Sequence, residues 1–84
     1  HADNIIIPNI LILRIEASVL YFNSEHIQNQ ITEMIANFQG ILKLVILDMS
    51  ASSYVDVSGS KMLLQLSESL KSKNIQFKIV EALS

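Results

Sequence analysis

The sequence contains no cysteine and no cluster of positive charge, and these two absences exclude several classes of function. Without cysteine the chain forms no disulfide and offers no thiolate nucleophile or thiolate metal ligand. The net charge is −2, and the six basic residues are scattered along the chain: Arg14, Lys43, Lys61, Lys71, Lys73 and Lys78. Nucleic acids and acidic lipids both require a basic surface, so we expect neither as a partner.

Proline and glycine are rare, and the single proline interrupts the longest apolar region. That region runs from Ile5 to Phe22 and carries the charges of Arg14 and Glu16. A spanning helix needs about 20 apolar residues with few charges, so this region is not one. The 84 residues suffice for one domain. Only 17% are charged, so we expect apolar surface that a self-contact, a partner or further chain would cover.

The first quarter of the sequence predicts short strands. A β-branched run, Ile5–Ile7, is followed by a turn at Pro8-Asn9 and a strand over Ile10–Ile15. Val19–Phe22, which ends in an aromatic pair, is expected to be a further short extended piece. We therefore predict an antiparallel opening hairpin with the aromatic pair in its core.

Two later segments carry hydrophobic residues at helical spacing. The first begins near Asn23, is expected to stop at Gly40, and has an apolar stripe formed by Ile27, Ile31, Met34, Ile35 and Phe38. The second follows Asp56, with Asn74 as its C-terminal cap, and has an apolar stripe formed by Met62, Leu63, Leu66 and Leu70.

Each predicted helix is followed by a predicted strand. Leu44–Leu47 is apolar on both faces, which favours a central parallel strand covered on each side. Within Ile75–Ile79, apolar and polar residues alternate, which suits a strand nearer the edge of the sheet. The order β-β-(β)-α-β-α-β therefore predicts an α/β fold with a mixed β-sheet and packed helices. The expected core includes Ile31, Ile35, Ile46, Leu63 and Leu66.

Polar residues gather where the central strand ends and the second helix begins. Ligands of open α/β sheets bind beyond the carboxyl ends of the strands, and a helix N-terminus offers free N–H groups to an anion. The candidates for a ligand- or partner-binding loop are Asp48, Ser50, Asp56, Ser58, Gly59 and Ser60. The competing interpretation, favoured on residue types alone, is that Asp56 or Ser58 caps the helix and Gly59 lets the turn pass.

No pattern in the sequence predicts catalysis or a metal site. His26 falls in the first turn of an amphipathic helix, where a solvated histidine is the usual case, and no second histidine is spaced to share a metal. Neither a phosphate-binding glycine loop nor a nucleophile elbow is present. We therefore expect no enzyme and no required cofactor, with an anion or nucleotide at the loop as the open alternative.

Two stretches resemble the STAS family. Val45–Ser50, a short loop and then Tyr54–Gly59 opening a helix are similar to the family's signature. STAS domains occur as free anti-sigma-factor antagonists and as the cytosolic C-terminal part of SulP sulfate and anion transporters. Ile10–Ser24, with an arginine–acid strand, an aromatic pair and a small polar helix start, resembles the transporter group.

The sequence departs from the family in two respects. The antagonists' phosphorylated serine directly follows the aspartate, a position held here by Val57, while Ser58 matches the second hydroxyl position before Gly59. The phosphorylation switch is therefore not expected. STAS domains also continue beyond the strand that ends near Val80, so the resemblance implies that residues 1–84 are a single STAS domain incomplete at its C-terminus. We expect the apolar strand there to promote self-association.

The resemblance implies a regulatory, non-catalytic interaction domain of a SulP-type sulfate or other anion transporter. Such a domain would lie on the cytoplasmic side of the membrane. Its expected partners are the membrane part of the parent transporter, a second copy or a cytosolic protein. The alternative is a free-standing partner-switching protein of the anti-sigma-factor antagonist kind.

Overall fold

The structure is a computed structural model that describes residues 7–52 and 54–81. Three strands and two helices alternate along the chain: β1 (Ile10–Arg14), α1 (Ser24–Ala36), β2 (Leu44–Asp48), α2 (Val57–Ser72) and β3 (Gln76–Val80). The strands form one sheet in the order β1-β2-β3, and both pairings are parallel. The predicted α/β architecture is therefore confirmed.

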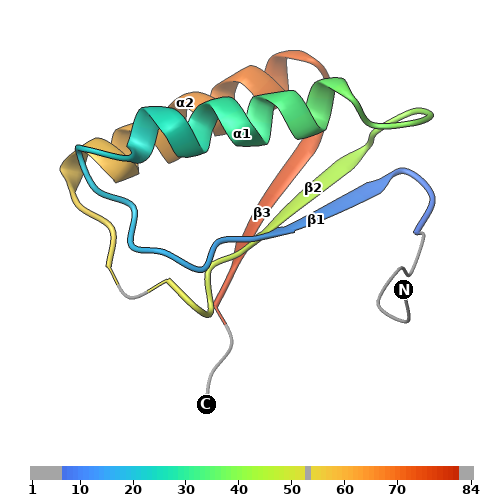
Figure 1. The fold of residues 1–84 in the computed structure, drawn as a ribbon. Coiled ribbons are helices and arrows are strands. Elements are labelled where there is room, and N and C mark those ends of the chain that lie inside the picture. Colours follow the sequence, from blue (N-terminus) through green and yellow to red (C-terminus); the bar gives the residue numbers. More distant parts are fainter. Residues whose placement is uncertain (1–6, 53, 82–84) are drawn as a thin grey trace.

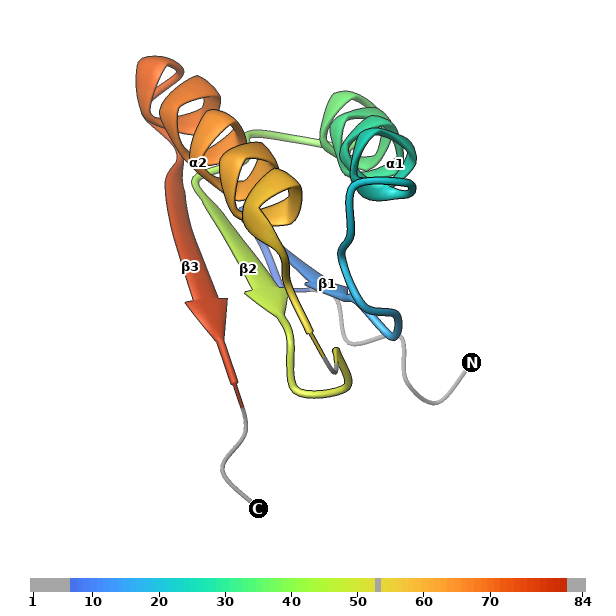
Figure 2. The same ribbon diagram turned by 90° about the vertical axis from the view of Figure 1, so that its left-hand side faces the viewer.

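Both helices lie on the same face of the sheet (Figures 1 and 2). Right-handed crossovers that proceed in one direction across a sheet leave every connecting helix on one side. Val45 and Leu47, which point to the helices, are 0% exposed, whereas Ile12 on the other face is 53% exposed. The expectation that β2 is covered on each side is wrong for the described residues, and we call the uncovered side the open face.

The hydrophobic core lies between the sheet and the two helices. Its buried members come from every layer: Ile15, Val19, Ile27, Ile31, Val45, Leu47, Met49, Met62, Leu66 and Leu70. Of the predicted core, Ile31 and Leu66 are confirmed, and Ile35 and Leu63 are only partly buried at its rim. Ile46 belongs to the open face, because side chains alternate along a strand and its neighbours Val45 and Leu47 face the helices.

The ends of the helices follow from their capping residues. The side chain of Asp56 caps α2, and Asn74 takes a left-handed conformation (φ 60°) just beyond its end. The N–H of Ile75 then donates to the carbonyl of Leu70, which closes the helix in a Schellman arrangement. α1 ends before the predicted stop, and Gly40, with φ 98°, lies in the loop that follows.

The predicted opening hairpin lies only partly within the described residues, where the N–H of Ile10 donates to the carbonyl of Ile7 at 3.3 Å across the predicted turn at Pro8-Asn9. Ile5 and Ile6 lie outside them, and β1 pairs in parallel with β2. Val19 forms a single parallel bridge to Val55 instead of starting a strand. Tyr21 and Phe22 are exposed, so the expected burial of this aromatic pair in a hairpin core is wrong.

Candidate functional site

Two loops meet beyond the carboxyl ends of β1 and β2. The loop from β1 to α1 covers residues 15–23, and the loop from β2 to α2 covers residues 49–56; together we call them the loop pair. The N–H of Val19 donates to the carbonyl of Tyr54 at 2.8 Å, and the N–H of Asp56 donates to the carbonyl of Val19 at 3.1 Å. These two backbone hydrogen bonds hold the loops side by side.

The carboxylate of Asp56 joins the loop pair to the first turn of α2. One oxygen accepts from the N–H of Gly59 at 2.9 Å, and the other accepts from the N–H of Tyr21 at 2.8 Å. The capping role expected for Asp56 is confirmed. The bond to Tyr21 spans 35 residues of sequence, and no local pattern signals it. Both carboxylate oxygens serve the fold in this structure.

Gly59 lets α2 approach the loop pair closely. A Cβ at this position would meet the carbonyl oxygen of Val19 at 2.5 Å and a methyl group of Val55 at 2.9 Å. Only hydrogen fits there, so Gly59 is a packing residue inside the first turn of the helix. Gly59 therefore allows close packing against Val19 and Val55, whereas the sequence suggested that it allows a turn.

Asp48 and Ser50 form a separate unit on the side of the open face. The backbone N–H of Ser50 donates to Asp48 Oδ1 at 2.9 Å. The hydroxyl and N–H of Ser50 hold the pKa of the Asp48 carboxyl below its ordinary value; desolvation opposes this, and the nearby Arg14 charge adds a lesser lowering effect. Since Asp48 points away from the helices and Asp56 caps α2, the structure does not bring the two carboxylates together.

The other candidates surround the start of α2. Ser58 is half-buried, Ser60 is exposed, and the N–H of Ser60 already donates to the carbonyl of Asp56 at 2.9 Å. Two N–H groups of the first turn thus have partners in Asp56, and its carboxylate lies where an anion would bind. Anion or nucleotide binding at this helix end stays a prediction.

The loop pair and the first residue of α2 together display four large apolar side chains, which we call the loop-pair patch. Tyr21 is 76%, Phe22 69%, Tyr54 63% and Val57 71% exposed. The rings of Tyr21 and Phe22 meet edge to face with centroids 5.5 Å apart. Sequence reasoning missed this patch, because it assigned the aromatic pair to a hairpin core. The signal was the turn-forming Asn23 directly after it, whose side chain closes that turn by bonds to Leu20 N and Ser18 O.

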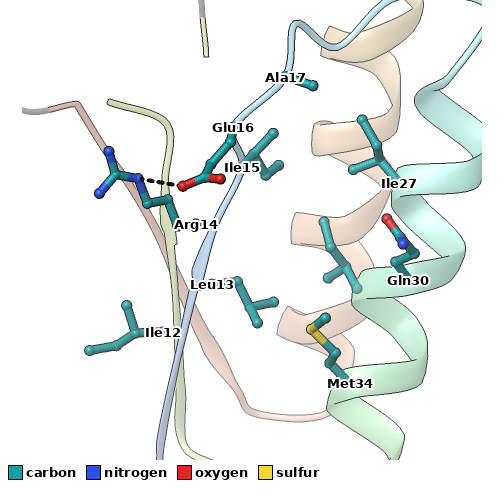
Figure 3. A pocket seen from close by; sticks show the side chains of 10 residues that line it. Ile12, Leu13, Arg14, Ile15, Glu16, Ala17, Ile27, Gln30 and Met34 are labelled. Carbon is teal, nitrogen blue, oxygen red and sulfur yellow. Dashed lines mark ion pairs between the residues drawn. The ribbon is translucent and has the colours of Figure 1, made fainter. Parts of the chain in front are cut away.

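The described residues offer little else for chemistry. Residues 7–52 and 54–81 contain no group of three or more His, Cys, Asp or Glu side chains placed to hold a metal ion. Within the same residues, no helix has both the length and the apolar character needed to cross a membrane. Arg14 and Glu16 form an exposed ion pair at 3.6 Å (Figure 3), a kind of contact that contributes little stability.

Comparisons with known proteins agree on a family. The STAS domain family model matches residues 1–83. Two proteins of Arabidopsis thaliana are similar in sequence: "Probable sulfate transporter 3.4" is 33% identical over 82 residues, and "Probable sulfate transporter 3.5" is 30% identical over 70 residues. The alignments cover 88% and 83% of this chain but 13% and 11% of the relatives, so the chain spans a small part of their length.

Solved structures give the same result. The murine Slc26a9 anion transporter in the inward-facing state matches with a TM-score of 0.82 and 26% identity, covering 93% of this chain and 13% of that one. The STAS domain of a SulP transporter from Vibrio cholerae matches with a TM-score of 0.68 and 16% identity, covering 95% of this chain and 59% of that one, and shows likeness of fold. The loop pair and its helix cap therefore belong to a chain that is a member of the STAS domain family, similar to the STAS domains of SulP-type sulfate and anion transporters.

Proposed function

We propose that this chain is the regulatory, non-catalytic docking domain of a SulP-type sulfate or anion transporter, and that the loop-pair patch is its docking surface. The domain lies on the cytoplasmic side of the membrane and contacts the membrane part of the same transporter. The similarity to sulfate transporters, of which the chain covers about an eighth, supports this setting. Transport itself is the work of the remaining protein.

The loop-pair patch is the observation that carries the docking role. Exposed aromatic side chains are enriched at protein interfaces, where they fill pockets on the partner. Here Asp56 holds the backbone of Tyr21 and Val19 holds the backbone of Tyr54, so less backbone freedom is lost on binding. Exposed apolar side chains on loops with anchored backbones suit a protein partner better than a dissolved substrate.

The partner-switching alternative has weaker support. Val57, at the position of the antagonists' phosphorylated serine, is the first residue of α2 and has no hydroxyl. A kinase of that system would have to modify Ser58, which is half-buried.

Self-association through β3 stays a secondary proposal. Ile79 and Val80 are exposed on this strand, while Phe77 packs partly against the core. The exposed apolar area is therefore small, and sedimentation of the chain should detect at most weak dimers.

The test is sulfate uptake by cells that express the full-length protein carrying this chain. Replacing Phe22 with Asp places a charge in the patch without removing a buried contact, since the side chain is exposed. We expect uptake to fall severalfold while the amount of protein in the membrane stays constant. Leu64→Asp is the matched control, because Leu64 is an exposed apolar residue of α2 outside the loop pair.

Two results would contradict the proposal. Unchanged sulfate uptake with Phe22→Asp would show that transport does not depend on the loop-pair patch. An equal loss with Leu64→Asp would show that any exposed charge on the domain has the same effect.

A further inference from the structure

The loop-pair patch consists of two halves that come from different segments of the chain. Tyr21 and Phe22 belong to the loop before α1, whereas Tyr54 belongs to the loop before α2 and Val57 is the first residue of that helix. Both helices begin at the same end of the molecule, which brings the two segments together (Figure 1). A partner that contacts all four side chains therefore requires the two halves to keep a fixed relation to each other.

One hydrogen bond ties the Tyr21 half of the patch to the other half. Residues 20–23 form a turn that closes on itself, since the N–H of Asn23 donates to the carbonyl of Leu20 at 3.1 Å and Asn23 Oδ1 accepts from the N–H of Leu20 at 2.8 Å. Within the part of the chain that the structure describes, the only hydrogen bond between this turn and the loop from β2 to α2 is donated by the N–H of Tyr21 to Asp56. The Asp56 carboxylate thus fixes where the turn stands relative to that loop.

Capping alone does not require an aspartate at position 56. Asparagine and serine are about as favourable as aspartate at a helix N-cap. An asparagine whose Oδ1 accepted from Gly59 would turn its NH₂ group toward the N–H of Tyr21, so that two donors would face each other. A serine has a single oxygen, which can serve only one of the two N–H groups. Of these three residues, only aspartate presents two acceptors at once, and each of them makes one of the observed bonds, at 2.9 and 2.8 Å.

We propose that Asp56 is the positioning residue of the docking surface: one carboxylate oxygen caps α2, and the other holds the Tyr21 half of the loop-pair patch in place against the Tyr54 half. This inference rests on the docking function proposed above. Asp56 is half-buried and both of its oxygens accept hydrogen bonds, so it acts through Tyr21 and not by contact with the partner. Hydrogen bonds to a carboxylate are stronger than those between neutral groups, which suits a single link in an exposed loop.

Asp56→Asn separates the two roles, because it keeps the cap and removes the acceptor for Tyr21. Hydrogen exchange of the full-length protein, read by mass spectrometry at single-amide resolution, should show the N–H of Tyr21 exchanging about tenfold faster, with little change at Gly59. Asp56→Ser should behave in the same way, whereas Asp56→Ala should speed exchange at both N–H groups. Glu68→Gln is the matched control, because Glu68 is an exposed carboxylate of α2 outside the loop pair, and it should change neither.

Sulfate uptake by cells that express the full-length protein tests whether this placement matters for docking. At a constant amount of protein in the membrane, we expect Asp56→Asn to lower uptake about twofold to threefold, which is less than the loss with Phe22→Asp. Glu68→Gln should leave uptake unchanged. In the double variant with Phe22→Asp, Asp56→Asn should add no further loss, because the surface that it positions is already disabled.

Three results would overturn the proposal. Unchanged exchange at Tyr21 in Asp56→Asn would show that the carboxylate does not hold the turn. Faster exchange at Tyr21 with full uptake, where Phe22→Asp still lowers uptake, would remove the positioning role and leave the docking function intact. A further loss of uptake in the double variant would show that Asp56 acts through the stability of the domain instead.

Failure of the docking function itself gives a different result. In that case Phe22→Asp would leave uptake unchanged, and the positioning role would fall with the surface that it serves. The single variant at Phe22 and the single variant at Asp56 therefore distinguish the two failures.

Discussion

The two faces of the sheet are built from the same three strands and similar residues, yet their environments differ completely. On the helix side, Val45 and Leu47 are fully enclosed by α1 and α2. On the open face, Ile12 is largely exposed and Ile46 is only partly covered. Side-chain chemistry alone therefore does not decide burial in this chain; the direction in which the helical connections cross the sheet does.

The largest expected effect is a difference in stability between substitutions on the helix side and on the open face of the sheet. Leu47→Ala should lower the free energy of unfolding by about 2–5 kcal/mol, because it leaves a cavity in a fully enclosed site. Ile12→Ala should cost less than about 1 kcal/mol, because most of its side chain already contacts water. Urea denaturation of both variants measures the difference. Equal losses would show that the open face is covered in solution.

Gly59→Ala tests how closely α2 packs on the helix side of the sheet. The added methyl group would collide with the backbone carbonyl of Val19, so the first turn of α2 must shift. We expect a loss of about 1–3 kcal/mol, typical of overpacking, and a lower midpoint of thermal unfolding. Gly40→Ala is a useful contrast, since nothing lies within 4 Å of a Cβ there and its cost comes from the positive φ alone. A neutral Gly59→Ala would refute the close approach.

Asp56, which caps α2 on the helix side of the sheet, can be compared with Asp48 on the side of the open face. Asp56→Ala removes the helix cap and the bond to Tyr21, and should cost about 1–2 kcal/mol. Asp48→Ala removes only a bond within its own loop and should cost less. Denaturation midpoints measured on both variants test this order, and a reversed order would contradict the assignment of Asp56 as the link between the loops.

The smallest expected effect is a pH dependence at Asp48. Its pKa is lower in the folded state, so its carboxylate contributes stability above the pKa of the unfolded chain. That contribution is lost as the pH falls through the folded pKa, below about pH 4. The stability difference between the native chain and Asp48→Asn should thus be constant near neutral pH and shrink in acid. A difference that grows in acid would require a raised pKa.

The sequence predicted the order of helices and strands because periodicity and capping residues act locally. The start, the end and the buried side of α2 could each be predicted from residues within one or two helical turns: Asp56 at the start, Asn74 at the end, and the apolar stripe that contains Leu66. The covered face of β2 could not be predicted in the same way. Leu47 and Ile46 are equally apolar, and only the shared direction of the two crossovers decides which of them is enclosed.

The candidate site was predicted only in its location. Asp56 and Gly59 were identified as residues of the loop, but the bond to Tyr21 and the contact with Val19 join segments about 35 to 40 residues apart. Such contacts follow from the fold, not from spacing. For the same reason the aromatic pair that begins with Tyr21 was expected inside a hairpin, whereas it forms part of an exposed patch.

The docking role can be tested most directly by photo-crosslinking in the full-length protein in its native membrane. A benzoylphenylalanine residue would replace Phe22 in one variant and Leu64 in another, both exposed apolar positions. The account predicts a crosslink from position 22 to the membrane part of the transporter and none from position 64. Absence of that crosslink from position 22, or equal crosslinking from both positions, would contradict it.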